Sequence, residues 1–280
     1  MNERALLQRA QRVVVKVGTR VLTRPPGGLV LSRLYEIVEQ LAELHRDGRE
    51  VLLVSSGAVG LGRESLGLDD EPMDLGLRQA CAAVGQSRLM ELYQHGFARL
   101  GIRVAQLLLT RQDFERPEEI HNVEGVLRQL LERRVLPIVN ENDVVATEEL
   151  ALRETVDGQR TFGDNDQLSA LVATRLYCHL LVLCTDVDGV FDADPRAAPE
   201  AELIGTMSAE RTGDGAGAPQ LGGPTPSGRG GMRSKVEAAR LVARAGCHGL
   251  IVNGREPGRI VEGARGGRVG TWFPAEGRHE

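Results

Sequence analysis

Short apolar segments without a polar face recur along this chain, and stretches of helical periodicity separate them. A strand that is apolar on both sides is usually buried on both sides, which is typical of parallel sheets covered by helices. The alternation therefore predicts an α/β fold, a three-layer αβα sandwich around a mainly parallel central sheet. We expect its strands at residues 13–17, 51–54, 104–109, 136–139, 180–184 and 250–252.

The segments between these strands carry apolar residues three and four positions apart, which predicts helices. Ser32 is expected to cap the first helix, and Gly48 is expected to end it. A Gly- and Pro-rich stretch at residues 212–231 contains little that can be buried, so we expect a long mobile loop there. Other helices are predicted just after residues 55–60 and at residues 77–100, 118–133, 166–177 and 234–245.

With 280 residues, 41% of them hydrophobic, the chain can bury a substantial core. Its net charge of −5 argues against nucleic-acid binding, which usually needs a basic surface. No segment approaches the roughly 20 apolar residues of a membrane helix, and the start lacks the apolar core of a signal peptide. We therefore expect a cytoplasmic protein that binds small molecules. Its cysteines have no metal-site spacing and are expected to be buried free thiols: Cys81, Cys178, Cys184 and Cys247.

Only two of the 34 Lys and Arg residues are lysines, and both lie at glycine-rich turns. Lys16 interrupts an apolar strand, where an ammonium group needs an anionic partner unless it snorkels to solvent. Lys235 ends the long loop, and Ser234 with Glu237 forms a capping-box pattern that would make Lys235 the first helical residue. A compact ammonium and a planar guanidinium are not interchangeable. The two placements therefore indicate a site for phosphate, although a solvated lysine at either position is the alternative.

Three polar segments lie at predicted strand ends or helix starts. Residues 55–60 (SSGAVG) would expose backbone N–H groups at a helix start, where anions bind. Residues 140–143 (NEND) follow a strand, and residues 163–166 (GDND) precede a helix. Ordinary turns and helix caps are the alternative interpretation, but one cap needs a single side chain. The surplus of polar groups indicates an active-site network.

Familiar nucleotide-binding signatures are missing: there is no Walker A loop, no GxGxxG between a strand and a helix, and no protein-kinase motif set. The DVDG sequence at residues 186–189 resembles the start of a calcium loop, but Val190 replaces a required oxygen ligand. The polar segments contain no histidine that could act as a general base. Phosphoryl transfer to a carboxylate fits them, because an ionised carboxylate needs no general base. We expect ATP and Mg²⁺, with the metal held on the ATP phosphates and no dedicated protein ligands.

Eight segments in order resemble the amino acid kinase family, and within it the enzymes that phosphorylate L-glutamate. Together they span residues 13 to about 253. The segments are VVVKVGTR (13–20), SSGAVGLGR (55–63), AAVGQSRLM (82–90), VAQLLLT (104–110), NENDVVAT (140–147), FGDNDQLSAL (162–171), CTDVDGVFDADP (184–195) and GGMRSKVEAA (230–239).

The resemblance implies that ATP phosphorylates the side-chain carboxylate of L-glutamate to L-glutamyl 5-phosphate, the first step of proline biosynthesis. It implies catalytic roles for Lys16, Asp166 and Lys235. The implied substrate-binding residues are Ser56, Gly57, Ala58, Asp143 and Asn165, with Asp143 facing the ammonium group of glutamate. The implied ATP-binding residues are Lys16, Gly18, Thr185, Asp186, Arg229, Gly230, Gly231, Met232, Arg233, Ser234 and Lys235.

The resemblance also implies one kinase domain over residues 1–280. Residues 1–155 would bind the amino acid and residues 156–275 the nucleotide. It implies a homo-oligomer and functional coupling to glutamyl phosphate reductase, with no nucleic acid or membrane partner. Many members carry a C-terminal PUA domain, and we expect a form without it. Arg229 stands where the family commonly has threonine. The alternatives are a sibling kinase for another small acid or nucleotide, and a non-catalytic nucleotide-binding homologue.

Overall fold

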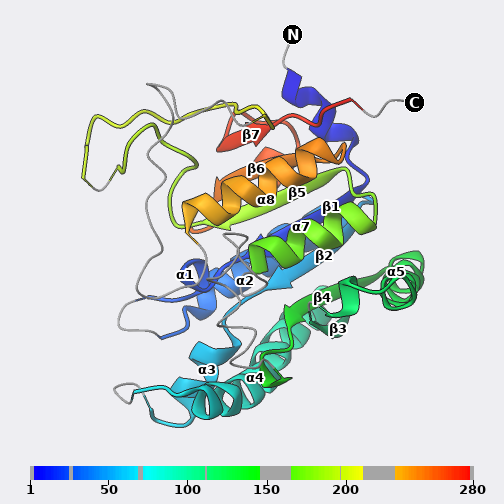
Figure 1. Cartoon of the computed structure of the whole chain (residues 1–280), viewed down its shortest axis with the longest axis vertical. Helices are drawn as coiled ribbons and strands as arrows, with labels where there is room; N and C mark the ends of the chain where they lie inside the picture. Colours follow the sequence, from blue (N-terminus) through cyan, green and yellow to red (C-terminus); the bar gives the residue numbers. More distant parts are fainter. Residues whose placement is uncertain are drawn as a thin grey trace.

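A computed structural model describes residues 3–24, 28–68, 72–110, 112–145, 165–195, 197–210 and 231–277. Its strands are β1 (Arg12–Val17), β2 (Glu50–Ser55), β3 (Arg103–Leu109), β4 (Val135–Glu141), β5 (Leu180–Thr185), β6 (His248–Asn253) and β7 (Thr271–Phe273). They form one sheet in the order β3-β4-β2-β1-β5-β6-β7 (Figure 1). Every neighbouring pair is parallel except β6 and β7. The predicted mainly parallel sheet is confirmed.

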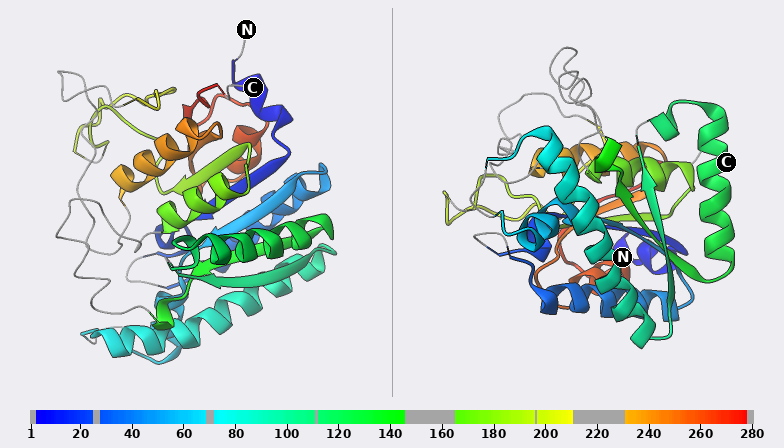
Figure 2. Two further views of the ribbon diagram at one scale, coloured as in Figure 1. Left: turned by 45° about the vertical axis from the view of Figure 1, so that its right-hand side comes forward. Right: turned by 90° about the horizontal axis from the view of Figure 1, so that it is seen from below.

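Helices cover both faces of this sheet, as the sequence predicts. They are α1 (Thr19–Leu22), α2 (Leu31–Arg46), α3 (Ala58–Ser65), α4 (Leu75–Arg99), α5 (Pro117–Glu132), α7 (Asn165–Arg175), α8 (Met232–Arg244) and α9 (Arg259–Ala264), with 3-10 turns η1 (Glu3–Arg9), η2 (Gln112–Phe114) and η3 (Asp143–Val145). One face packs on α2, α4 and α9, and the other on α5, α7 and α8. Figures 1 and 2 show α7 and α8 side by side on that second face.

The ends of α2 test two predictions. Gly48 follows the helix with a φ of +89°, in the left-handed region that glycine tolerates best, so its predicted role as the stop is confirmed. The predicted cap by Ser32 is wrong. Helix α2 begins at Leu31, and its N-cap, Val30, makes no side-chain capping bond. Capping residues raise the stability of a helix start, but tertiary packing can set the start without one.

Helices α3 and α4 cross at two glycines. A Cβ atom on Gly85 would overlap the carbonyl oxygen of Ala58, and one on Gly62 would overlap that of Cys81. Glycine alone allows two helix backbones to approach this closely. The contact fixes the start of α3, and therefore the turn at residues 56–57 that connects it to β2.

Three further predictions bear on the fold. All four cysteines are buried and free, as predicted. Of the helices that the structure describes, none combines the length and the apolar character needed to cross a lipid bilayer. The predicted mobile loop at residues 212–231 lies outside the described residues, apart from Gly231.

Candidate active site

Lys16 belongs to β1, the middle strand of the sheet. Successive side chains of a strand point to opposite faces. Val15 and Val17 belong to the core on the α2 side, whereas Lys16 extends toward α7 on the other face, where Val14 also packs. Only 3% of Lys16 is exposed, so it does not snorkel to solvent. Its ammonium group must be compensated inside the protein.

Asp166 supplies that compensation and binds both lysines of the chain. Its Oδ1 atom lies 2.7 Å from Nζ of Lys16, and its Oδ2 atom lies 3.1 Å from Nζ of Lys235. The hydroxyl of Ser234 donates to the same Oδ2 at 2.7 Å. Asp166 is fully buried, and Lys235 is 6% exposed. We call these four side chains the ammonium cluster.

The electrostatics of the ammonium cluster favour an anion. Burial by itself raises the pKa of Asp166, but the charges of Lys16 and Lys235 and the hydrogen bonds from Lys16 and Ser234 outweigh it and hold that pKa well below its usual range. Asp166 is therefore ionised, and two ammonium groups share one carboxylate. Counted over its own four side chains, the ammonium cluster carries one net positive charge in a site with little access to water, where charges act strongly.

The predicted capping box at Ser234 and Glu237 is wrong, because α8 begins at Met232 with Gly231 as its N-cap. Ser234 lies inside the first turn, and its hydroxyl bonds Asp166 and the carbonyl oxygen of Gly231 instead. Lys235 accordingly reaches the cluster from within the first turn. The 13-residue helix still directs its positive N-terminal end toward the same region.

A second group of polar side chains gathers at the carboxyl ends of β2 and β4. Nδ2 of Asn165 donates to the hydroxyl of Ser56 at 2.7 Å and to Oδ1 of Asn140 at 2.9 Å. Gly57 follows with a φ of +115°, and Ala58 begins α3. Asn165 directly precedes Asp166, so one turn of α7 connects this group to the ammonium cluster.

Asp143 lies nearby in η3 and faces α4. Its Oδ1 atom is 3.7 Å from a guanidinium nitrogen of Arg78, and both side chains are partly exposed. An acidic and a basic group at one partly open position match the two charges of an α-amino acid. The sequence predicted Asp143 but missed Arg78, which stands in the first turn of α4 among residues that give no local sign of a site.

The other predicted residues lie at the strand ends beside β1. A Cβ atom on Gly18 would be 3.3 Å from Nζ of Lys16, so this glycine leaves the ammonium group open on one side. Thr185 ends β5, and its hydroxyl donates to Asp186 at 3.4 Å. Arg233 pairs with Glu237 on the exposed side of α8, away from the cluster. Arg229 and Gly230 lie outside the described residues.

The sequence analysis predicts no set of protein side chains that would bind a metal ion. Among the described residues, no three His, Cys, Asp or Glu side chains gather as a metal site requires. Both oxygens of Asp166 already face ammonium groups.

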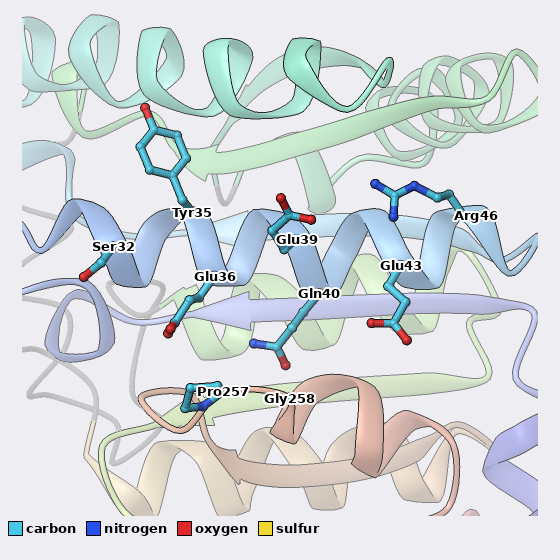
Figure 3. Close-up of a pocket in the computed structure, with 9 residues that line it drawn as sticks. All are labelled: Ser32, Tyr35, Glu36, Glu39, Gln40, Glu43, Arg46, Pro257 and Gly258. Atoms are coloured by element: carbon cyan, nitrogen blue, oxygen red, sulfur yellow. The ribbon is translucent and has the colours of Figure 1, made fainter.

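A hollow of about 490 Å³ lies elsewhere, between α2 and the turn before α9 (Figure 3). Its lining includes Glu36, Glu39 and Glu43 of α2 together with Pro257. Figure 3 shows these glutamates along one helix, and α2 packs on the opposite face of the sheet from α7 and α8. This acidic hollow is separate from the ammonium cluster and has the wrong charge for a phosphate.

Comparison with known proteins identifies one family that this sequence matches. The model of the amino acid kinase family matches residues 11–253, which include every member of both polar groups. The chain belongs to the amino acid kinase family. The likeness that the sequence motifs indicated is thereby confirmed, and with it the expected fold.

Similar curated proteins are glutamate 5-kinases. That of Chromohalobacter salexigens is 46% identical over 268 residues, which cover 96% of this chain and 68% of the relative. Those of Geobacter metallireducens and Thermus thermophilus are 40% and 42% identical, and each match covers 96% of this chain and 69% of the relative.

Solved structures confirm the amino acid kinase fold. The UMP kinase of Ureaplasma parvum aligns with a TM-score of 0.62 at 16% identity, over 95% of this chain and 99% of that one. An isopentenyl phosphate kinase aligns with a TM-score of 0.59 at 19% identity, over 94% and 99% of the two chains. At these identities the likeness concerns the fold alone.

Proposed function

We propose that this chain is a glutamate 5-kinase, which transfers the γ-phosphoryl group of ATP to the side-chain carboxylate of L-glutamate and so begins proline biosynthesis. The observation that carries the proposal is the placement of both lysines on one buried carboxylate, Asp166, within a chain 40–46% identical to glutamate 5-kinases. The intact cluster argues against a non-catalytic homologue. The L-glutamyl 5-phosphate product is an acyl phosphate, which we expect glutamyl phosphate reductase to consume.

In this proposal each substrate lies on its own side of β1. Strand β2 ends at Ser55, just before Ser56, strand β4 ends at Glu141, just after Asn140, and strand β5 ends at Thr185. In this proposal residues 1–155 bind glutamate beyond β2 and β4, and residues 156–275 bind ATP beyond β5 and β6. Lys16, on the strand between them, would contact the phosphoryl group in transit. Ligands of open α/β sheets bind at the carboxyl ends of strands, which supports this assignment.

The proposed phosphoryl transfer depends on the charges of the substrate carboxylate and of the two ammonium groups. A carboxylate nucleophile is ionised at neutral pH, so the protein need not remove a proton from it. Lys16 and Lys235 would bind the phosphoryl oxygens, and Asp166 would hold both ammonium groups in position. Such preorganised charges stabilise the transition state without rearranging during the reaction. Mg²⁺ on the ATP phosphates would neutralise further negative charge.

The polar group at β2 and β4 would bind glutamate. Ser56 and Asn165 would contact it, with Gly57 and Ala58 shaping the turn, and Asp143 would pair with its ammonium group. Thr185, Asp186, Gly18 and residues 229–235 would surround the nucleotide. We also propose a homo-oligomer located in the cytoplasm.

An ADP-release assay with Mg²⁺ tests this function on four acceptors: L-glutamate, L-aspartate, N-acetylglutamate and UMP. Hydroxylamine in the same reaction traps an acyl phosphate as a hydroxamate. We expect turnover and hydroxamate with L-glutamate and at most a small fraction of that rate with the others. Turnover with another acceptor alone would assign the chain to a sibling kinase. No turnover with any of them would overturn the kinase assignment.

A further inference from the structure

Four side chains from four parts of the chain form a continuous line of hydrogen bonds at the proposed glutamate site. Nδ2 of Asn140 donates to Oε1 of Gln86 at 2.8 Å, Nδ2 of Asn165 donates to Oδ1 of Asn140 at 2.9 Å, and the same Nδ2 donates to the hydroxyl of Ser56 at 2.7 Å. Gln86 and Asn140 are buried. We call this line the amide relay.

One backbone contact fixes the direction of the amide relay. The N–H of Glu141 donates to Oδ1 of Asn140 at 2.9 Å, and a backbone N–H cannot accept. The oxygen of the Asn140 amide must therefore face Glu141, and its nitrogen must face Gln86. Gln86 in turn must present its oxygen, so the orientation of both side-chain amides follows from the one N–H donor of Glu141.

The Asn165 amide, on the substrate side of the relay, is oriented in the same way. The group of Asn165 that faces Oδ1 of Asn140 must be its nitrogen, whose two N–H groups serve Asn140 at 2.9 Å and Ser56 at 2.7 Å, with the carbonyl oxygen of Ser55 farther away at 3.3 Å. Ser56 consequently accepts from Asn165 through its oxygen, and an amide nitrogen cannot accept the Ser56 proton. Among the described residues, Oδ1 of Asn165 is buried and accepts no hydrogen bond. Two groups thus remain to serve a ligand: the Ser56 hydroxyl as a donor and the Asn165 oxygen as an acceptor.

We infer that Gln86 is a positioning residue that sets the donor and acceptor roles at the amino-acid site without touching the substrate. This inference rests on the proposed function. The Ser56 O–H donates to a carboxylate oxygen of the ligand, and the Asn165 oxygen accepts from its N–H group. Without the Gln86 oxygen, the buried amide nitrogen of Asn140 has no acceptor among the described residues. Turning the amide over would set its nitrogen against the Glu141 N–H, so Asn140 leaves its position and Asn165 loses its anchor.

Two substitutions at one position separate this role from packing. Gln86→Met keeps the length of the side chain and removes the acceptor, whereas Gln86→Glu keeps an oxygen at the same place. We expect Gln86→Met to raise KM for L-glutamate about 5- to 100-fold, the effect of one unsatisfied buried group. KM for ATP should change less than twofold. Gln86→Glu should restore most of the affinity, although it buries a charge, and Gln129→Met on the exposed side of α5 is the control.

The outcomes are distinct. Two results would overturn the inference: a wild-type KM for L-glutamate in Gln86→Met, or an equal rise of that KM in the Met and Glu variants. A residue needed only for packing would tolerate Met better than Glu. A wild-type enzyme inactive on L-glutamate in the same assay would overturn the proposed function instead.

Hydrogen exchange of the side-chain amides, followed by NMR without substrate, tests the relay independently of activity. We expect slow exchange at Asn140 and Asn165 in the wild type and the Glu variant, and fast exchange in the Met variant; equally fast exchange in all three would also overturn it.

Discussion

The carboxylate of Asp166 lies 2.7 Å from the ammonium group of Lys16, and neither side chain reaches solvent appreciably. Lys16 comes from the central strand and Asp166 from the first turn of α7, 150 residues later in the chain. A buried ion pair of this kind is strongly destabilising when only one partner is removed, because the other charge remains in the interior.

Asp166→Asn should therefore weaken the fold as well as catalysis. The asparagine keeps the shape of the side chain but removes the buried negative charge that binds both ammonium groups. We expect the free energy of unfolding to fall by about 3–5 kcal/mol in urea titrations. Glu262→Gln, which breaks the exposed pair with Arg259, is the matched control and should change it by less than about 1 kcal/mol. Equal stability of the two variants would contradict a buried cluster.

Lys235→Arg tests the requirement for an ammonium group. A planar guanidinium cannot occupy the same small volume between Asp166 and a phosphoryl group. We expect kcat to fall about 10²- to 10³-fold, as for the loss of one transition-state donor, while circular dichroism and the urea midpoint stay close to those of the wild type. Arg259→Lys, at a solvent-exposed side chain of α9 away from the cluster, should leave kcat unchanged. Near-normal turnover of Lys235→Arg would refute the specific role of this lysine.

Stability should depend on pH through Asp166. The pKa of this group is lower in the folded protein than in the unfolded chain, because the two ammonium groups outweigh the effect of burial. Its contribution is thus complete above the unfolded pKa of about 4 and is lost as pH falls toward the folded pKa. We expect the wild type to lose more unfolding free energy between pH 5 and pH 3 than Asp166→Asn does. Parallel losses in the two proteins would show that Asp166 is not responsible.

Gly85→Ala should separate α3 from α4. The added methyl group would overlap the carbonyl oxygen of Ala58, so one helix must move. We expect a loss of about 1–3 kcal/mol in unfolding free energy and a higher KM for L-glutamate, because α3 follows directly from Ser56. The control is Gly125→Ala in α5, where a Cβ atom meets nothing within 4 Å. That substitution should stabilise the protein by about 0.5–1 kcal/mol. A Gly85→Ala variant that matches Gly125→Ala would show that the helices separate freely.

The sequence predicted the sheet well because fully buried parallel strands leave a local signal, a run of apolar residues, that needs no partner to recognise. It predicted Lys16 and Lys235 for a related reason, since a charge within an apolar strand or a glycine-rich turn is locally unusual. Strand β7 and helix α9 were missed. With three and six residues, they are too short to show a period.

The remaining errors involve side chains whose partners lie far away in the chain. Ser234 has a typical capping pattern, but its hydroxyl donates a hydrogen bond to Asp166, 68 residues earlier in the chain. Gln86 has the sequence of an ordinary helix residue, and only its contact with Asn140, 54 residues later, gives it a role. Local patterns do not contain such contacts, so the donors and acceptors of the site could be read only from the structure.

Strand β1 pairs on one side with β2 and on the other with β5, which begins at residue 180. During synthesis at about 5–20 residues per second, its second edge therefore stays open for many seconds after the first is covered. An open apolar edge is a place where nascent chains aggregate, and a charge within it is a common protection. We therefore expect the ammonium group of Lys16 to protect the growing chain against aggregation until Asp166 and β5 leave the ribosome.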